Sequence, residues 1–203
     1  MNAKLRRSVA ALATVFACLA LMASPASATT HGATITSGNF TLVSEDGSVS
    51  QNFPWAGSGG TNCGHTLEID ETATAWNVTQ YSSRARIPFI FNAYIIVITR
   101  TGSTAGTVSG TTLNASTLSL DVKFYNVLNN SPATDCNTTG SPRCQYTATL
   151  SLSGTVTGWT PSSTGTISYP TAPLAWGGGS CAAPHATFFD GTVAAGGFSF
   201  TVQ

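Results

Sequence analysis

Hydrophobic and polar residues alternate along several segments with the period of a β-strand. From 118 to 124, four apolar side chains at even positions are separated by three polar ones. The same pattern returns at 146–152 and at 198–202. Because successive side chains of a strand point to opposite faces, each segment is predicted to be a strand with one face in a core and the other in water.

The segment 87–98 differs, because it is apolar at both odd and even positions. It is too short to cross a membrane as a helix, and Pro88 would break a helix interior. It predicts one strand, or two strands meeting near Asn92 and Ala93, buried between layers.

Turn-forming pairs recur between these segments, and no stretch shows a convincing apolar stripe of helical period. Among the pairs are Asp46-Gly47, Ser153-Gly154 and Asp190-Gly191. Short strands separated by such turns are typical of an all-β fold. The sequence predicts an antiparallel β-sandwich, Ig-like or jelly-roll-like, that forms a single domain over 29–203.

The first 28 residues have the three parts of a secretory signal peptide. A basic start is followed by an apolar run from Val9 to Ala23 and by the small residues Ala26-Ser27-Ala28. This order predicts cleavage of 1–28 and export from a bacterial cell, so the mature protein is expected to be secreted or at the cell surface. Lipid attachment at Cys18 and an uncleaved anchor are the alternatives.

Charge excludes one class of partner. Removing 1–28, with three of the eight Lys and Arg residues, leaves five cations and eight acidic residues. A nucleic-acid-binding protein needs clustered cations that displace counterions from phosphates, so no nucleic acid is expected as a partner. No transmembrane helix is expected in the mature chain either.

Four cysteines remain after cleavage, and an oxidising compartment predicts two disulfides. The segment between Cys136 and Cys144 is rich in turn residues, which makes local closure easy. The predicted pairs are therefore Cys136–Cys144 and Cys63–Cys181. The competing interpretation is a zinc site that combines cysteines with nearby histidines, although the spacing is not that of a zinc finger.

His31 is a candidate copper ligand. Cleavage after Ala28 would make it the third mature residue, where the terminal amine, two amides and the imidazole can form the square-planar nitrogen set that Cu(II) favours. Cleavage after Thr30 would place His31-Gly32 first. That start resembles the copper brace of lytic polysaccharide monooxygenases, and the resemblance implies copper held with the help of a second histidine.

His65 and His185 are the candidates for further metal ligands. If Cys63 pairs with Cys181, both histidines lie within a few residues of one disulfide and can reach a common point. The alternative is that they are ordinary polar residues in loops around a structural bridge.

Trp55, Trp159 and Trp176 are each flanked by Gly or Pro, which places them in or beside loops. Indoles on loops of a rigid β scaffold can stack on sugar rings while the ring nitrogen donates a hydrogen bond. The alternative is that they cover the ends of the core.

The sequence favours a secreted, non-enzymatic structural or binding module of the bacterial cell surface or extracellular space. A polysaccharide or a cell-envelope component is the expected partner, with glycan contacts through the loop tryptophans. The first alternative is a copper-binding protein or copper-dependent oxidative enzyme that uses His31 with His65 or His185. The second is a strand-built pore of the cell envelope. The G-x-S-x-G motif of many hydrolases is absent.

Overall fold

The computed structural model describes residues 27–56, 63–88, 93–126, 138, 140–180, 188 and 190–203. The predicted signal peptide lies outside these residues except for Ser27 and Ala28. Three predicted site residues also lie outside them: Cys136, Cys181 and His185.

Twelve strands make up the described secondary structure. They are β1 (Thr29–Val43), β2 (Ser50–Pro54), β3 (His65–Glu71), β4 (Ala75–Pro88), β5 (Ala93–Thr104), β6 (Gly106–Ser109), β7 (Thr112–Asn126), β8 (Cys144–Val156), β9 (Thr164–Tyr169), β10 (Ala172–Gly179), β11 (Thr192–Val193) and β12 (Gly196–Val202). The prediction of an all-β fold is confirmed.

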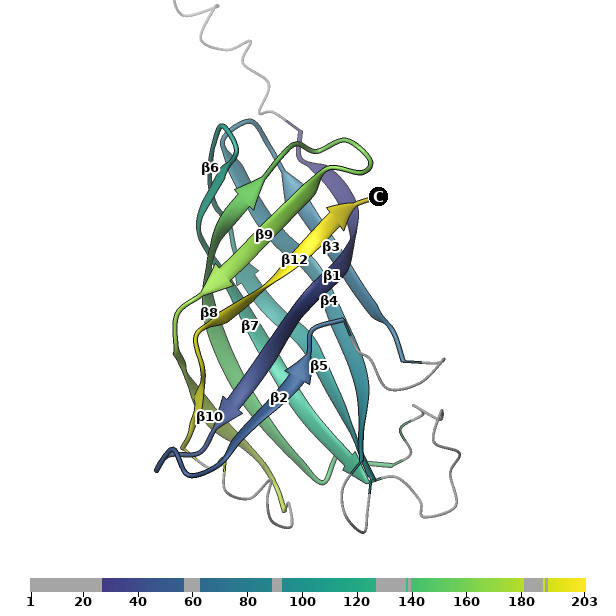
Figure 1. Cartoon of the computed structure of the whole chain (residues 1–203), viewed down its shortest axis with the longest axis vertical. Helices are drawn as coiled ribbons and strands as arrows, with labels where there is room; N and C mark the ends of the chain where they lie inside the picture. The colour runs from purple at the N-terminus through teal and green to yellow at the C-terminus, as the bar shows by residue number, and fades with distance from the viewer. Residues whose placement is uncertain are drawn as a thin grey trace, which may run out of the picture.

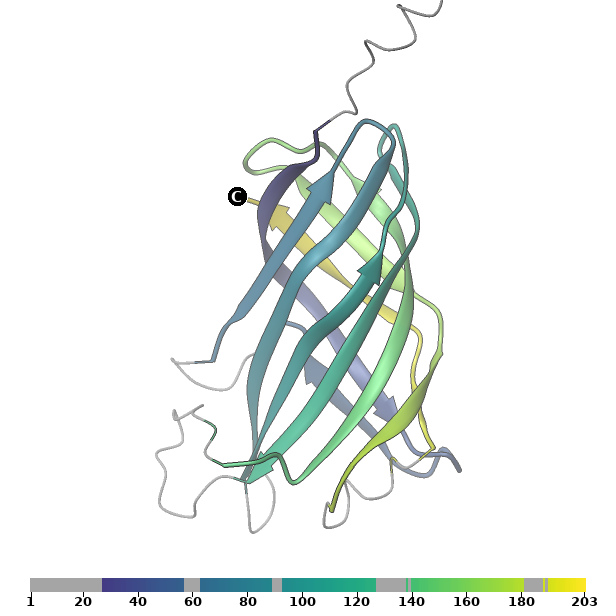
Figure 2. The ribbon, with the colours of Figure 1, turned by 180° about the vertical axis from the view of Figure 1, so that it is seen from behind.

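All twelve strands belong to one antiparallel sheet that returns on itself. Neighbouring strands follow the order β8, β9, β12, β1, β3, β4, β5 and β7, and β7 pairs again with β8 over eleven residue pairs. Figure 1 shows β9, β12 and β1 crossing the front of the resulting elongated body. Figure 2 shows the other side from behind.

Because β1 and β8 are long, the closed sheet connects them through two different sets of strands, one near each end. The end of β8 pairs with β9, whereas its beginning pairs with β10. Correspondingly, β1 pairs with β12 along its middle and with β11 near its end. We call the end that carries the β8–β9 connection (157–163) the upper end, and the end that carries the β1–β2 turn (44–49) the lower end, as oriented in Figure 1.

The inner face of the closed sheet is apolar. The predicted alternation is confirmed in all three segments, since their apolar side chains are buried and belong to one continuous core cluster. In β8, for example, Tyr146, Ala148 and Leu150 are buried while the intervening threonines are exposed. The segment with two apolar faces forms the end of β4 and the start of β5, and the successive residues Ile95 and Ile96 are both buried.

The predicted sandwich is not confirmed. A sandwich has two sheets with separate edges, whereas here β7 and β8 join the ends of one sheet. Each strand has one inner and one outer face in either arrangement, so the alternation along the sequence is the same for both.

Candidate functional site

Trp55 follows β2 and lies inside the core. Its side chain is fully buried. Four aromatic rings surround it at centroid distances of 5.1–5.7 Å, those of Phe40, Tyr81, Tyr169 and Phe198. The indole Nε1 donates to Tyr169 Oη at 3.2 Å. A buried indole has no face available to an external sugar ring. Trp55 therefore packs in the core, as in the alternative interpretation of its sequence, and cannot stack on a sugar in this structure.

Three buried tyrosines have altered acidity. Desolvation raises the pKa of Tyr81 far above the usual tyrosine value, although a hydrogen bond with Ser83 opposes this. Desolvation also raises the pKa of Tyr169 to about 12, opposed by the hydrogen bond from Trp55, and raises the pKa of Tyr146 to about 12. These phenols therefore stay protonated even at mildly alkaline pH. Tyr81 Oη donates to Trp55 O at 3.0 Å.

Trp159 lies at the upper end, in the connection between β8 and β9. It is half-buried and packs against the core. Its indole stacks on the imidazole of His31, with ring centroids 5.2 Å apart and planes inclined by 25°. His31 Nε2 in turn lies 3.4 Å from Glu71 Oε2. We call Trp159, His31 and Glu71 the upper-end cluster; it combines an indole, an imidazole and a carboxylate, groups that can stack on or hydrogen-bond to a sugar.

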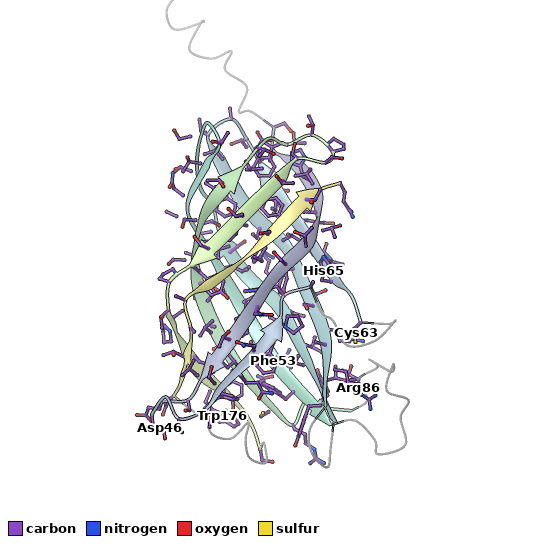
Figure 3. The ribbon with its side chains drawn as sticks, viewed as in Figure 1. Asp46, Phe53, Cys63, His65, Arg86 and Trp176 are labelled. Carbon is purple, nitrogen blue, oxygen red and sulfur yellow. The ribbon has the colours of Figure 1, made fainter. Side chains whose placement is uncertain are left out.

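Trp176 lies near the lower end, in β10. It is half-buried, and its ring meets that of Tyr146 edge-on at a centroid distance of 5.1 Å. Figure 3 shows both Trp176 and Asp46 of the β1–β2 turn toward the lower end. Hydrogen bonds from Ser44 and Ser48 hold the pKa of Asp46 at about 2, so this turn keeps its negative charge. The three predicted tryptophans therefore lie at the two ends and in the core, and do not form one site.

His65, the first residue of β3, is a structural bridge. Its Nε2 accepts a hydrogen bond from Ile35 N at 2.8 Å. Because a backbone N–H can only donate, Nδ1 carries the ring proton and donates to Ala56 O at 2.9 Å. Both ring nitrogens are engaged, so metal ligation by His65 would require breaking one of these hydrogen bonds.

The register between β1 and β3 explains this bridge. His31 pairs with Ile69, and Ala33 pairs with Leu67. Continued in this register, Ile35 would lie opposite His65, but the pairing of β1 with β3 ends at Ala33 and Leu67. The imidazole therefore replaces a backbone ladder bond at the point where the strands separate.

His31 and His65 do not come together as one of the copper hypotheses requires, whereas a site with His185 stays a prediction because His185 lies outside the described residues. His31 and His65 lie on neighbouring strands, about 13 Å apart along the strand direction at four residues' separation. The square-planar set at His31 would also require residues 29–31 to leave β1, where they pair with β3. Within the described ranges, no three His, Cys, Asp or Glu side chains gather closely enough to hold a metal ion.

Two of the four cysteines can be placed. Cys63 precedes β3, and Cys144 begins β8. No two cysteines of the described residues lie at bonding distance from each other. Because Cys136 and Cys181 lie outside those residues, the pairs Cys63–Cys181 and Cys136–Cys144 stay a prediction.

A surface of hydroxyl groups covers the outer face of β8, β9 and β12. We call it the hydroxyl wall; its members are Thr147, Thr149, Ser151, Ser153, Thr155, Thr164, Thr166, Ser168, Ser199 and Thr201. Several are joined across strands: Thr155 and Thr166 hydroxyls are 3.1 Å apart, and those of Ser119 of β7 and Thr149 are 3.0 Å apart. Sequence analysis did not identify this surface. Its signal is the absence of any charged residue from 145 to 180.

The outer face of β3 and β4 has a different character. We call it the charged wall; its charged members are Glu68, Asp70, Arg84 and Arg86. Asp70 accepts a hydrogen bond from Thr30 Oγ1 at 2.6 Å. The closed sheet thus has one neutral outer surface and one ionic outer surface over the same apolar interior.

Comparison with protein-family models, with curated proteins and with solved structures gives no match for this chain. No helix in the described part of the chain has the length and apolar character needed to cross a membrane.

Proposed function

We propose that the protein is a secreted bacterial module, without enzymatic activity, that binds a neutral polysaccharide at its outer surface. The hydroxyl wall is the binding surface, and Trp159 lies at its upper end. The observation that carries the proposal is the continuous, uncharged array of Ser and Thr side chains on β8, β9 and β12.

The chemistry of this surface suits a neutral polyhydroxylated chain. Each hydroxyl can donate one hydrogen bond and accept others, as sugar hydroxyls do. Strands about 4.8 Å apart, with outward side chains about 6.7 Å apart along each strand, give a repeating lattice of such groups. A charged polysaccharide would lose water from its ions on this surface without gaining an opposite charge. A neutral polysaccharide has no such desolvation cost.

Trp159 adds an aromatic contact to the array. Its connection joins β8 to β9, so the indole borders the upper ends of the strands that carry the wall. His31 supports one side of the indole, which limits its freedom before a ligand arrives.

The distribution of apolar side chains disfavours the pore hypothesis. Strands that face lipid carry apolar residues outward and polar residues inward. Here the core cluster fills the interior and Ser and Thr face outward on β8 and β9.

Two disulfides, Cys63–Cys181 and Cys136–Cys144, complete the proposal. Both described cysteines lie where a strand begins or is about to begin, so bridges there would restrain the adjoining connections. Intact mass measured without reduction, compared with the mass after reduction, gives the number of bridges and the site of signal cleavage. Free thiols in the denatured, unreduced protein would contradict this part.

Sedimentation with insoluble neutral polysaccharides, such as cellulose, chitin and an α-glucan, tests the binding function. The wild-type chain should sediment with at least one of them, and the double variant Thr155→Val/Thr166→Val should bind at least about fivefold less, because two neutral hydrogen bonds are lost. Thr107→Val, at an exposed position of β6, is the matched control and should bind as wild type does.

The two half-buried tryptophans provide a second matched pair. Trp159→Ala should weaken sedimentation, whereas Trp176→Ala near the lower end should not. Binding that needs Trp176 and tolerates the loss of Trp159 would move the site to the lower end. Binding unchanged in the double threonine variant would contradict the hydroxyl wall as the binding surface.

A further inference from the structure

A pocket of about 400 Å³ lies on the outer face of β3, β4 and β5, apart from the hydroxyl wall. Its volume falls in the range of small-molecule sites, about 300–1,000 Å³. The lining residues that matter for its chemistry are Gly64, Thr66, Ser82, Arg84, Val97 and Thr99. The other lining residues are His65 and Ser83.

Strand register explains the hollow. One row across the three strands consists of Thr66, Ser82 and Thr99, which are paired neighbours. In the next row, Arg84 pairs with Val97 on one side, and its backbone N donates to Gly64 O at 3.1 Å on the other. Gly64 has no side chain, and the space that a Cβ would occupy there is open. The outer surface is therefore hollowed where this row reaches β3.

The polar groups of the pocket define what it can recognise. Thr66, Ser82 and Thr99 supply hydroxyls, and those of Thr66 and Ser82 are 2.9 Å apart. Arg84 supplies a cation whose planar donor groups match a carboxylate. Both ring nitrogens of His65 are already hydrogen-bonded, to Ile35 N and to Ala56 O, so the imidazole offers no further polar atom to a ligand.

We propose that this pocket binds a carboxylate-bearing sugar, a uronate, either free or as a residue of an acidic polysaccharide. Arg84 pairs with the carboxylate, the hydroxyls of Ser82 and Thr99 bond to ring hydroxyls, and Val97 packs against the apolar face of the sugar ring. A neutral sugar offers no carboxylate to the guanidinium of Arg84, and an inorganic anion offers neither ring hydroxyls nor an apolar face. This site goes beyond the neutral-polysaccharide surface and does not depend on it.

Isothermal titration of the full chain with sodium glucuronate tests the proposal. Glucuronate should bind at least about tenfold more tightly than glucose, because a charge-assisted pair is lost with the neutral sugar. Sulfate tests whether any anion suffices, and it should bind more weakly than glucuronate. An oligogalacturonate distinguishes the two sources, since tighter binding per chain than the monosaccharide indicates an acidic polymer, and equal or weaker binding indicates a free uronate.

Two variants and two matched controls locate the site. Arg84→Gln removes the cation and should weaken glucuronate binding about tenfold or more. Gly64→Leu fills the hollow and should abolish binding. Arg86→Gln removes the next outward cation of β4 outside the pocket, and Gly102→Leu adds a side chain at another glycine with open space beside it; both should bind as wild type does.

Several outcomes would overturn the proposal. No heat of binding with glucuronate at millimolar concentration would end it, as would glucose or sulfate binding as tightly as glucuronate. Wild-type affinity in Arg84→Gln would place any binding elsewhere, and this result holds even if Gly64→Leu does not fold. Sedimentation of these variants with neutral polysaccharides should be unchanged, so failure here is distinguishable from failure of the hydroxyl-wall proposal.

Discussion

The hydroxyl wall and the charged wall have the same inner pattern and opposite outer patterns. In β8, buried apolar residues alternate with Thr and Ser; in β3, the buried residues Leu67 and Ile69 alternate with Glu68 and Asp70. The inward residues are interchangeable in kind, because any apolar side chain of suitable size fills a closed sheet. The outward residues do not pack the core, so the two walls can differ in charge and in the ligands they bind. The inward side chains therefore stabilise the closed sheet, and the outward side chains determine what its surface can bind.

Trp55 is where the two walls meet inside, and its removal has the largest expected effect. Its ring contacts Tyr81 of β4, whose outer face belongs to the charged wall, and Tyr169 of β9, whose outer face belongs to the hydroxyl wall. Trp55→Ala should lower the free energy of unfolding by about 3–5 kcal/mol, because a large fully buried ring leaves a cavity. Urea unfolding followed by far-ultraviolet dichroism measures this loss.

Trp176→Ala is the control for that measurement. Trp176 is half-buried, and its ring packs against Tyr146 of β8. Its replacement by Ala should therefore lower the free energy of unfolding by only about 1–2 kcal/mol. Equal losses for the two variants would show that Trp55 does not join the walls as its contacts imply.

His65 tests the boundary between β1 and the charged wall. His65→Phe keeps a ring of similar size but leaves Ile35 N and Ala56 O without their imidazole partner. Two unsatisfied, partly buried backbone groups should make this variant about 2 kcal/mol less stable in the same urea experiment. Thr66→Val, at the next and exposed position, should change stability by less than about 0.5 kcal/mol. A His65→Phe protein as stable as wild type would contradict the bridging role.

The dependence of stability on alkaline pH tests whether the tyrosines between the two walls are shielded from water. Burial raises the pKa of Tyr146 and of Tyr169 to about 12, and that of Tyr81 further, while unfolded tyrosine ionises near pH 10. Between these values the folded state binds more protons than the unfolded state, so stability should fall as pH rises from about 10 toward about 12.

Urea unfolding at a series of pH values, with absorbance of the phenolate as a second signal, measures that fall. Tyr146→Phe removes one of the three groups, so its stability should decline less steeply over the same pH range. Stability that is constant up to pH 12 would mean that the tyrosines are already solvated in the folded protein.

The alternation of side chains could be predicted from sequence because it is local, and closure could not because it depends on partners. Leu118, Leu120 and Val122 show the period of a strand within seven residues. Nothing in that segment states that Leu118 will pair with Leu150 and so join the sheet to itself. The sandwich and the closed sheet differ only in such pairings.

The candidate site shows the same limit. Proline and glycine beside Trp55 correctly indicate the end of a strand, but the direction of its side chain is decided by Tyr81 and Phe198, which come from distant strands. Residue type alone makes His65 a metal candidate. Its bond to Ile35 depends on the β1–β3 register, which the sequence does not reveal.

The smallest effect is expected at the border between the walls, on β7. Lys123 Nζ lies 3.0 Å from Asp121 Oδ2, and both side chains are partly exposed. Lys123→Gln should change the free energy of unfolding by less than about 1 kcal/mol, because exposed ion pairs contribute little. If neutral hydroxyls alone make the adjacent wall a binding surface, this variant should also sediment with neutral polysaccharide as wild type does, at low and at high salt. A loss of sedimentation comparable to that of Thr155→Val/Thr166→Val would show that charge extends into the surface, and the contrast between the walls would then be one of degree.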